Sequence, residues 1–330
     1  MKQRIIGIIA LTLFSGLIFG QGTEKTTEFV PSGKPLLKIF SNFHNDFSDN
    51  GNHPAFEITR AYFGYGYNFS PFFSTKIVLD VADPGVGKLH QTVFLKNALL
   101  KYSNNNLTVN FGLIGLYQFS LQESFWSRRY LYKSFQDAYG FGPSADLGVT
   151  GAYKINKMIE MDASILNGEG YKNLQSDSTF KTGVGVTLRP VDGLVIRGYF
   201  DYMPKYAAQS SFNTFIGYAK DKFSLGVEYN LQNNHNRVND NDFSGVSAYG
   251  SYRLGEKFEA FGRYDYLTSN KLEGSTTGWN VSNDGQLYIA GIEYTPVKGV
   301  KIAPNFQGWD PAADGQPFKP SIYLNLQVSF

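Results

Sequence analysis

A group of charged side chains near one third of the way along the chain is the feature best suited to electrostatic chemistry. Its positive members are Arg128, Arg129 and Lys133, and its negative members are Glu123 and Asp137. Basic side chains that line a narrow aqueous passage attract anions, because low-dielectric walls focus the field across the passage. The group is therefore a candidate for attracting anions at a pore constriction.

The stretch that carries these charges is also rich in aromatic residues. Residues 123–142 contain seven of them, so the stretch is too apolar to remain extended in water. We expect it to fold onto an inner surface of the protein, with packing over a channel mouth or into a subunit contact as the alternatives. Aromatic rings also stack on sugars, and the candidates for such stacking are Phe125, Trp126, Tyr130, Tyr132, Trp279 and Trp309.

Catalytic and metal-binding patterns are weak. The chain has no cysteine, and its serine, histidine and aspartate residues show no spacing typical of a catalytic triad. His44 and His53, with Asp46 and Asp49 nearby, are a possible metal site, but a solvated loop explains them more simply. Gly183 and Gly185 lack the strand-to-helix turn that a phosphate-binding loop needs. We therefore predict no enzyme activity, no catalytic residue, no cofactor and no metal.

The elements that must position the charged groups are β-strands. Apolar and polar residues alternate along 321–330, 223–232, 194–202 and 145–154, which is the period of a strand with two different faces. A soluble β-sandwich would show the same period. These segments are about 10 to 12 residues long, however, which suits tilted strands that cross a membrane better than the strands of soluble sheets.

The connections between strands support a barrel. Short turns are predicted at 68–71, 104–106, 156–158, 190–193, 220–222, 255–257 and 296–299, where Asn, Gly, Pro, Asp or charged pairs occur. Longer polar connections are predicted near 46–54, 83–92, 117–143, 168–179, 204–210, 232–242, 268–284 and 310–319. Short turns on the periplasmic side and long loops on the extracellular side are typical of outer-membrane barrels. The count gives an all-β, transmembrane, antiparallel barrel of about 16 strands.

A barrel of this size encloses a water-filled lumen, into which the third long loop, 117–143, is predicted to fold. Successive side chains of a strand alternate between its two faces, and this parity places five further arginines on the lumen face: Arg60, Arg189, Arg197, Arg253 and Arg263. The same parity places seven carboxylates there: Asp146, Glu160, Asp162, Asp201, Glu228, Asp265 and Glu293. A net preference for anions and a lumen of mixed charge therefore both stay open.

Two local patterns give sharper expectations. Arg263 and Asp265 share one strand face, which predicts an ion pair inside the lumen. Arg60 and Lys96 interrupt the alternation in the first third of the chain, which predicts a β-bulge or an inward-pointing charge at each position.

The N-terminus and the overall charge indicate the compartment. Lys2 and Arg4 precede an apolar stretch over 5–19, typical of a signal peptide that ends near residue 20, with an uncleaved membrane anchor as the alternative. A short segment, 21–33, would then precede a barrel domain over 34–330. Removing Lys2 and Arg4 from the 30 basic residues leaves 28, which balances the 28 acidic ones. Bulk charge therefore predicts no nucleic-acid partner.

Several stretches resemble a known family. The chain ends in Phe330, as outer-membrane barrels commonly do, and carries Ser-Ile-Leu-Asn-Gly-Glu-Gly at 164–170, Lys-Thr-Gly-Val-Gly-Val at 181–186 and Arg-Pro-Val-Asp-Gly-Leu at 189–194. This run, followed by Tyr-Phe-Asp-Tyr at 199–202, is similar to the phosphate-selective porin O and P family of Bacteroidetes-type bacteria.

The resemblance implies a trimeric, 16-stranded pore of the bacterial outer membrane with a constricting third loop and a basic throat. The expected function is passive diffusion of small hydrophilic solutes or anions, with a mild anion preference that could extend to phosphate. Membrane lipids and lipopolysaccharide are the expected surroundings. A saccharide channel, a non-conducting structural barrel and a membrane hydrolase are the alternative classes.

Overall fold

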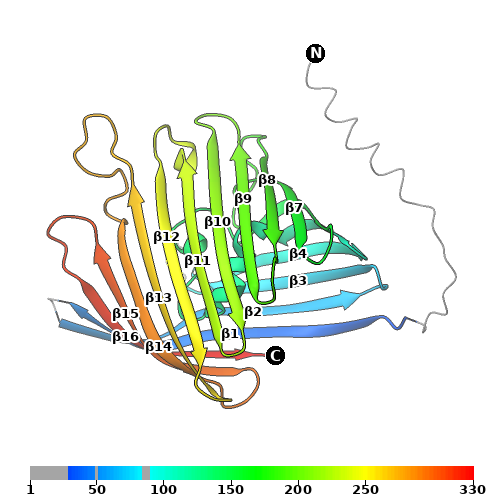
Figure 1. Ribbon diagram of the computed structural model, residues 1–330, viewed down its shortest axis with the longest axis horizontal. Coiled ribbons are helices and arrows are strands. Elements are labelled where there is room, and N and C mark those ends of the chain that lie inside the picture. Colours follow the sequence, from blue (N-terminus) through cyan, green and yellow to red (C-terminus); the bar gives the residue numbers. More distant parts are fainter. Residues whose placement is uncertain (1–28, 49–50, 84–89) are drawn as a thin grey trace. The chain divides into compact units, whose positions relative to one another are not determined.

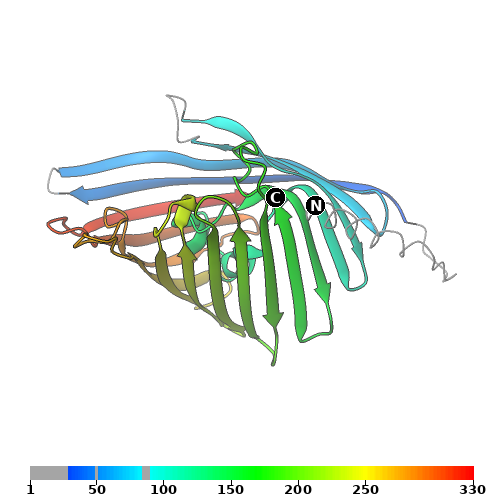
Figure 2. The ribbon, with the colours of Figure 1, turned by 90° about the horizontal axis from the view of Figure 1, so that it is seen from above.

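The computed structural model describes residues 29–48, 51–83 and 90–330. Within the unit Pro31–Phe330, sixteen antiparallel strands pair with their chain neighbours, and β1 pairs with β16 to close a barrel (Figures 1 and 2). The predicted signal segment 1–20 lies outside the described residues, as does most of 21–33.

The strands run as follows: β1 (Ser32–Ser48), β2 (Gly51–Asn68), β3 (Phe73–Ala82), β4 (Thr92–Asn104), β5 (Leu107–Gly115), β6 (Ala145–Lys154), β7 (Ile159–Leu166), β8 (Lys181–Leu188), β9 (Leu194–Met203), β10 (Gln209–Lys220), β11 (Phe223–Asn233), β12 (Phe243–Arg253), β13 (Phe258–Ser269), β14 (Gly285–Tyr294), β15 (Val300–Pro311) and β16 (Lys319–Ser329). The helical elements are α2 (Tyr117–Trp126), α3 (Phe135–Ala138) and η1 (His235–Arg237). The predicted count of about 16 strands is confirmed.

The two faces of the strands differ as the alternation predicts. On β9, Arg197, Tyr199 and Asp201 are buried on the inside, whereas Phe200 and Tyr202 are exposed on the outside. Large exposed apolar side chains recur on the outside of nearly every strand. The chain therefore presents an apolar outer face and turns charged side chains of its strands, such as Asp162, Arg197 and Arg263, inward. No helix among the described residues is long and apolar enough to cross a membrane.

The connections follow the sequence-based prediction at the short turns and depart from it at one loop. All seven predicted turns join consecutive strands. The predicted long connection at 46–54 is wrong, because β1 and β2 continue through it and pair Asp46 with His53 and Phe47 with Asn52. Polar composition indicated a loop there, but backbone pairing does not need apolar side chains. These two strands are consequently the longest, at 17 and 18 residues.

Both interruptions of the alternation are β-bulges. Thr59 is the extra residue in the pairing of β2 with β1, and Lys96 is the extra residue in the pairing of β4 with β3. A bulge turns the side chains beside it away from the regular pattern. The bulges help to bring Arg60 and Lys96 into the lumen, where Arg60 contacts Asp80 and Lys96 contacts Ser144.

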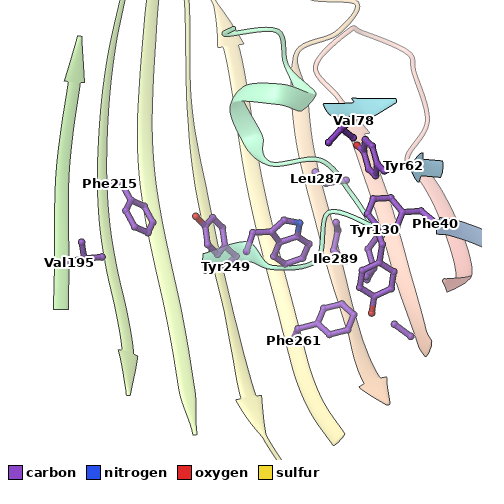
Figure 3. Packing of buried hydrophobic residues seen from close by; sticks show 13 residues of the cluster. Phe40, Tyr62, Val78, Tyr130, Val195, Phe215, Tyr249, Phe261, Leu287 and Ile289 are labelled. Atoms are coloured by element: carbon purple, nitrogen blue, oxygen red, sulfur yellow. The ribbon is translucent and has the colours of Figure 1, made fainter. Parts of the chain in front are cut away.

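The main cluster of buried apolar side chains lies inside the barrel. Phe40, Tyr62 and Val78 from β1–β3 pack near Tyr130 of the third loop, and Phe215 and Tyr249 project inward from β10 and β12 (Figure 3). The lumen is thus filled in part by the loop and by side chains of the wall.

Candidate functional site

The third loop connects β5 to β6 and folds into the lumen, as predicted. The blue-green helix α2 lies inside the ring of strands (Figure 2) and contacts β8, β10 and β11. Trp126, Phe135 and Phe141 of the loop are at most 1% exposed. Burial of these rings removes a large apolar surface from water and holds the loop inside the barrel.

Most ring contacts between the loop and the strands fall on one side of the barrel, whereas Tyr130 lies with its ring centroid 6.3 Å from that of Phe40 on β1. Trp126 packs edge-on against Tyr249 and Phe261, with ring centroids 5.8 and 6.3 Å apart. Phe141 stacks on Phe243 of β12 with a centroid distance of 4.2 Å. The partners of Trp126 and Phe141 all belong to β12 and β13, so the loop rests against that part of the wall.

Polar side chains of the same wall bind the backbone of the loop. Arg197 donates to the carbonyl of Tyr117 at 3.0 Å, and Arg263 donates to the carbonyl of Lys133 at 2.7 Å. Further donors to loop carbonyls are Gln232 to Phe141, Tyr249 to Gln122 and Asn325 to Tyr130. We call strands β8–β16 the anchoring wall, because these side chains and the aromatic contacts fix the loop to it.

Each anchoring arginine is neutralised by a buried carboxylate. Arg197 binds both oxygens of Asp162 at 2.6 and 3.0 Å, and Arg263 binds both oxygens of Asp265 at 2.8 and 2.6 Å. The predicted Arg263–Asp265 pair is therefore confirmed. A Cβ on Gly185 would lie 2.5 Å from Arg197 and 2.7 Å from Asp162, so the glycine provides the space for that pair.

Arg128 and Arg129 are adjacent in the chain but have different surroundings. Arg128 is 2% exposed and lies 3.0 Å from Glu259 and 3.5 Å from Glu293, with its guanidinium 4.8 Å from the ring centre of Phe261. It faces the anchoring wall and is compensated there. Tyr130 donates to Glu293 at 2.8 Å. Burial raises the pKa of the Tyr130 hydroxyl and the nearby Glu293 raises it further, so this hydroxyl stays protonated.

Arg129 faces the opposite side of the loop. Its guanidinium lies 2.7 Å from Asp137 and 3.8 Å from Glu123, and the side chain lines an open cavity. Lys133 is exposed. The structure thus separates the three basic residues into a buried arginine, an arginine that lines the cavity and an exposed lysine.

The open cavity has a volume of about 540 Å³ and lies between the loop and strands β1–β5. We call β1–β4 the open wall, because this part of the barrel leaves a gap beside the loop. The charged side chains that line the cavity are Lys38, Lys76, Lys96, Arg129 and Glu123. Four positive side chains therefore line the cavity, of which Arg129 is paired with Asp137 and Glu123.

The lysines of the open wall are poorly compensated. Within the described part of the chain, neither Lys38 nor Lys76 forms an ion pair. Lys96 donates to the hydroxyl of Ser144 at 2.9 Å and lies 5.5 Å from the ring centre of Tyr62. Such groups keep their field available to an ion in the cavity.

The basic lining continues toward the short turns. A second hollow of about 350 Å³ shares Lys76 with the first and adds Lys34 and Lys101. Lys34, Lys38, Lys76, Lys96 and Lys101 thus mark a continuous track along the inside of the open wall. We call these five residues the lysine track.

The remaining arginines expected on the lumen face occupy the margins of the site. Arg60 contacts the buried Asp80 at 2.7 Å on the open wall. Arg189 and Arg253 lie at the short-turn ends of β8 and β12 and are exposed. All seven carboxylates that parity placed inside are turned toward the lumen, and six of them are buried: Asp146, Asp162, Asp201, Glu228, Asp265 and Glu293.

The sequence-based interpretation missed the lysines of the track other than Lys96. Lys34 and Lys38 share the parity of Phe40, and Lys76 shares that of Val78 and Asp80, so alternation within β1 and β3 could have revealed them. Of the six aromatic candidates for sugar stacking, Trp126 and Tyr130 are 1% and 2% exposed and pack against the wall. The rings of Trp126 and Tyr130 are therefore not available to a solute in the lumen.

No family model and no curated protein matches the chain. Solved structures do match its fold. OmpF of Salmonella typhi, solved with daunomycin, has a TM-score of 0.69 at 11% identity, over 90% of this chain and 97% of that one. The outer-membrane channel DcaP of Acinetobacter baumannii has a TM-score of 0.65 at 14% identity, over 91% and 97% of the two chains. The trimer form of OmpT from Vibrio cholerae has a TM-score of 0.61 at 12% identity, over 92% and 100%.

Proposed function

We propose that the protein is an outer-membrane porin that lets small hydrophilic solutes diffuse passively and favours anions. The apolar outer face suits a lipid environment, since pairing of β1 with β16 closes the barrel and leaves no open sheet edge in the membrane. The partly filled lumen suits selective passage. The fold is similar to that of the outer-membrane channel DcaP and of the outer-membrane protein OmpT, which was solved in a trimer form, and we propose a homotrimer for this chain too.

The observation that carries the anion preference is the unequal compensation of charge around the loop. On the anchoring wall the buried cations lie beside carboxylates, as in Arg197–Asp162, Arg263–Asp265 and Lys181–Asp201. On the open wall, Lys38 and Lys76 face the cavity and form no ion pair with a carboxylate of residues 29–48, 51–83 or 90–330. A permeating ion therefore experiences a positive field beside the open wall.

The mechanism combines a size limit with an electrostatic filter. The loop narrows the passage, because its backbone is bonded to the anchoring wall and it leaves the cavity of about 540 Å³ beside the open wall. Lysines in a confined passage concentrate anions, since the low-dielectric barrel wall strengthens their field. The screening length is about 8 Å at physiological salt, so only residues that line the passage contribute strongly.

The test is the reversal potential of purified protein in planar bilayers across a KCl gradient. We expect the parent to prefer chloride, and Lys38→Gln with Lys76→Gln to lower the anion-to-cation permeability ratio about two- to fourfold. The matched control replaces Lys157 and Lys298, which are exposed in short turns, with glutamine and should leave the ratio unchanged.

Two results would contradict the proposal in different ways. If Lys38→Gln with Lys76→Gln has the same anion-to-cation permeability ratio as the parent, the lysine track does not set the ion preference. The absence of current steps from folded, inserted protein would refute the channel itself and favour a non-conducting structural barrel.

A further inference from the structure

The cavity beside the open wall is apolar as well as basic. Leu36, Phe40 and Val78 of the wall and Leu116 and Phe119 of the third loop line it together with the lysines. An apolar constriction opposes hydrated inorganic ions, because they cannot exchange their water shell for contacts with such a wall. A passage adapted only to chloride or phosphate has no use for this lining.

Strand geometry interleaves the two kinds of lining. Residues two apart share a face, so β1 presents Leu36, Lys38 and Phe40 in succession on the inside. On β3, Lys76 and Val78 alternate in the same manner. Each uncompensated ammonium group therefore has an apolar side chain next to it.

The pairing of strands extends this pattern sideways. Gly64 of β2 pairs with Leu36 on one side and Val78 on the other. A Cβ on Gly64 would lie 3.0 Å from the side chain of Val78 and 2.5 Å from the backbone of β3, so the glycine leaves the space between the apolar side chains of β1 and β3 open. The result is an apolar strip of the wall bordered by Lys38 and Lys76.

We infer that the passage favours small organic anions that carry an apolar body, such as aromatic or branched monocarboxylates, over inorganic anions. This inference rests on the proposed function and specifies its solute class. The carboxylate would lie near Lys38 or Lys76, and the apolar body would lie against Leu36 and Val78. A cavity of about 540 Å³ accommodates a single-ring molecule, since small-molecule sites span roughly 300 to 1,000 Å³.

The experiment measures how anions of equal charge and different apolar surface block the chloride current of the reconstituted full-length barrel. The probes are acetate, benzoate and inorganic phosphate, with benzyl alcohol as the uncharged ring. We expect benzoate to halve the chloride current at a concentration about tenfold below the concentration of acetate that does so, because burial of the ring adds apolar contact. Benzyl alcohol should block weakly because it lacks the charge.

Variants locate the effect within the barrel. Val78→Thr should reduce the benzoate-over-acetate preference about threefold, since it places a hydroxyl in the apolar strip. Val195→Thr is the matched control, because Val195 also points into the lumen, is 5% exposed against 3% for Val78, and lies outside the cavity. Both variants are checked for folding by their chloride conductance and by the change in electrophoretic mobility on heating.

The outcomes separate this inference from the proposed function. Equal half-block by benzoate and acetate, or stronger block by phosphate than by benzoate, overturns the inference while chloride conduction upholds the channel. Equal block by benzoate and benzyl alcohol shows that the charge plays no part and also overturns it. If the benzoate-over-acetate preference falls equally in Val78→Thr and Val195→Thr, the preference does not arise in this cavity. An absence of current in KCl overturns the proposed function itself.

Discussion

The two walls of the lumen use the same residue types for different purposes. On the anchoring wall, basic side chains are buried, paired with carboxylates and bonded to the backbone of the third loop, as Arg197 and Arg263 show. On the open wall, Lys38 and Lys76 face a cavity and form no ion pair among the described residues. Basic residues in a lumen are therefore not equivalent, and the position of the loop decides which of them a solute meets.

The largest effect should come from removing an anchor. Arg263→Gln leaves the carboxylate of Asp265, which is 0% exposed, without its cation and also removes the bond to the carbonyl of Lys133. Breaking a buried ion pair in this manner costs about 3 to 5 kcal/mol. We expect a clear fall in the thermal unfolding temperature in detergent, and open-channel current noise as the loop loosens.

The control for this change is Arg189→Gln. Arg189 lies 3.5 Å from Glu160, and its side chain is 43% exposed, so the pair should contribute little to stability. If Arg263→Gln unfolds at the same temperature as Arg189→Gln, the anchoring role assigned to the wall is wrong.

Much of the barrel could be predicted from sequence because the outer face must be apolar at every second position. The short turns followed from Asn, Gly and Pro at strand ends, and the inward fold of the third loop followed from its aromatic rings. The hairpin between β1 and β2 was missed because polar residues such as Asp46 and His53 can pair through their backbones as well as form a loop. Composition alone does not distinguish these two cases.

The candidate site was predictable only in part, for a reason of distance along the chain. Parity placed Arg197 inside the barrel but could not show that it binds Tyr117, which lies 80 residues earlier. Likewise, nothing local distinguishes Arg128 from Arg129, although one contacts Glu259 and the other lines the cavity. Strand register and loop position decide these partners, and both depend on long-range pairing.

The comparison between walls is sharpened by two adjacent arginines of the loop. Arg128→Gln should lower the unfolding temperature, because Glu293 is buried beside it, yet change ion selectivity little. Arg129→Gln should lower the anion preference, since it removes a positive charge from the cavity lining, and should also lower the unfolding temperature, because it leaves Asp137 without its cation. We expect an anion-to-cation permeability ratio about twofold lower for Arg129→Gln than for Arg128→Gln, measured by reversal potential. Equal ratios would show that the two sides of the loop are not electrically distinct.

The smallest effect concerns a histidine at the long-loop end of the anchoring wall. His235 of η1 stacks on Trp279, with ring centroids 5.6 Å apart, and its Nδ1 lies 2.6 Å from the side-chain oxygen of Gln232. Gln232 in turn donates to the carbonyl of Phe141 at 2.9 Å, so His235 supports the end of the third loop. Burial lowers the pKa of His235 below its ordinary value.

The direction of the pH effect follows from that shift. Because the folded state disfavours the protonated form, the unfolded chain binds more protons as the pH falls below about 6.5, and stability declines. Many groups titrate in this range, so the measurement is a difference between chains. The unfolding temperature of the parent should fall more between neutral and mildly acidic pH than that of His235→Gln, which carries no titrating ring. If the unfolding temperatures of the two proteins fall equally, protonation of His235 does not affect stability. The position of the loop would then depend on the ion-paired arginines of the anchoring wall.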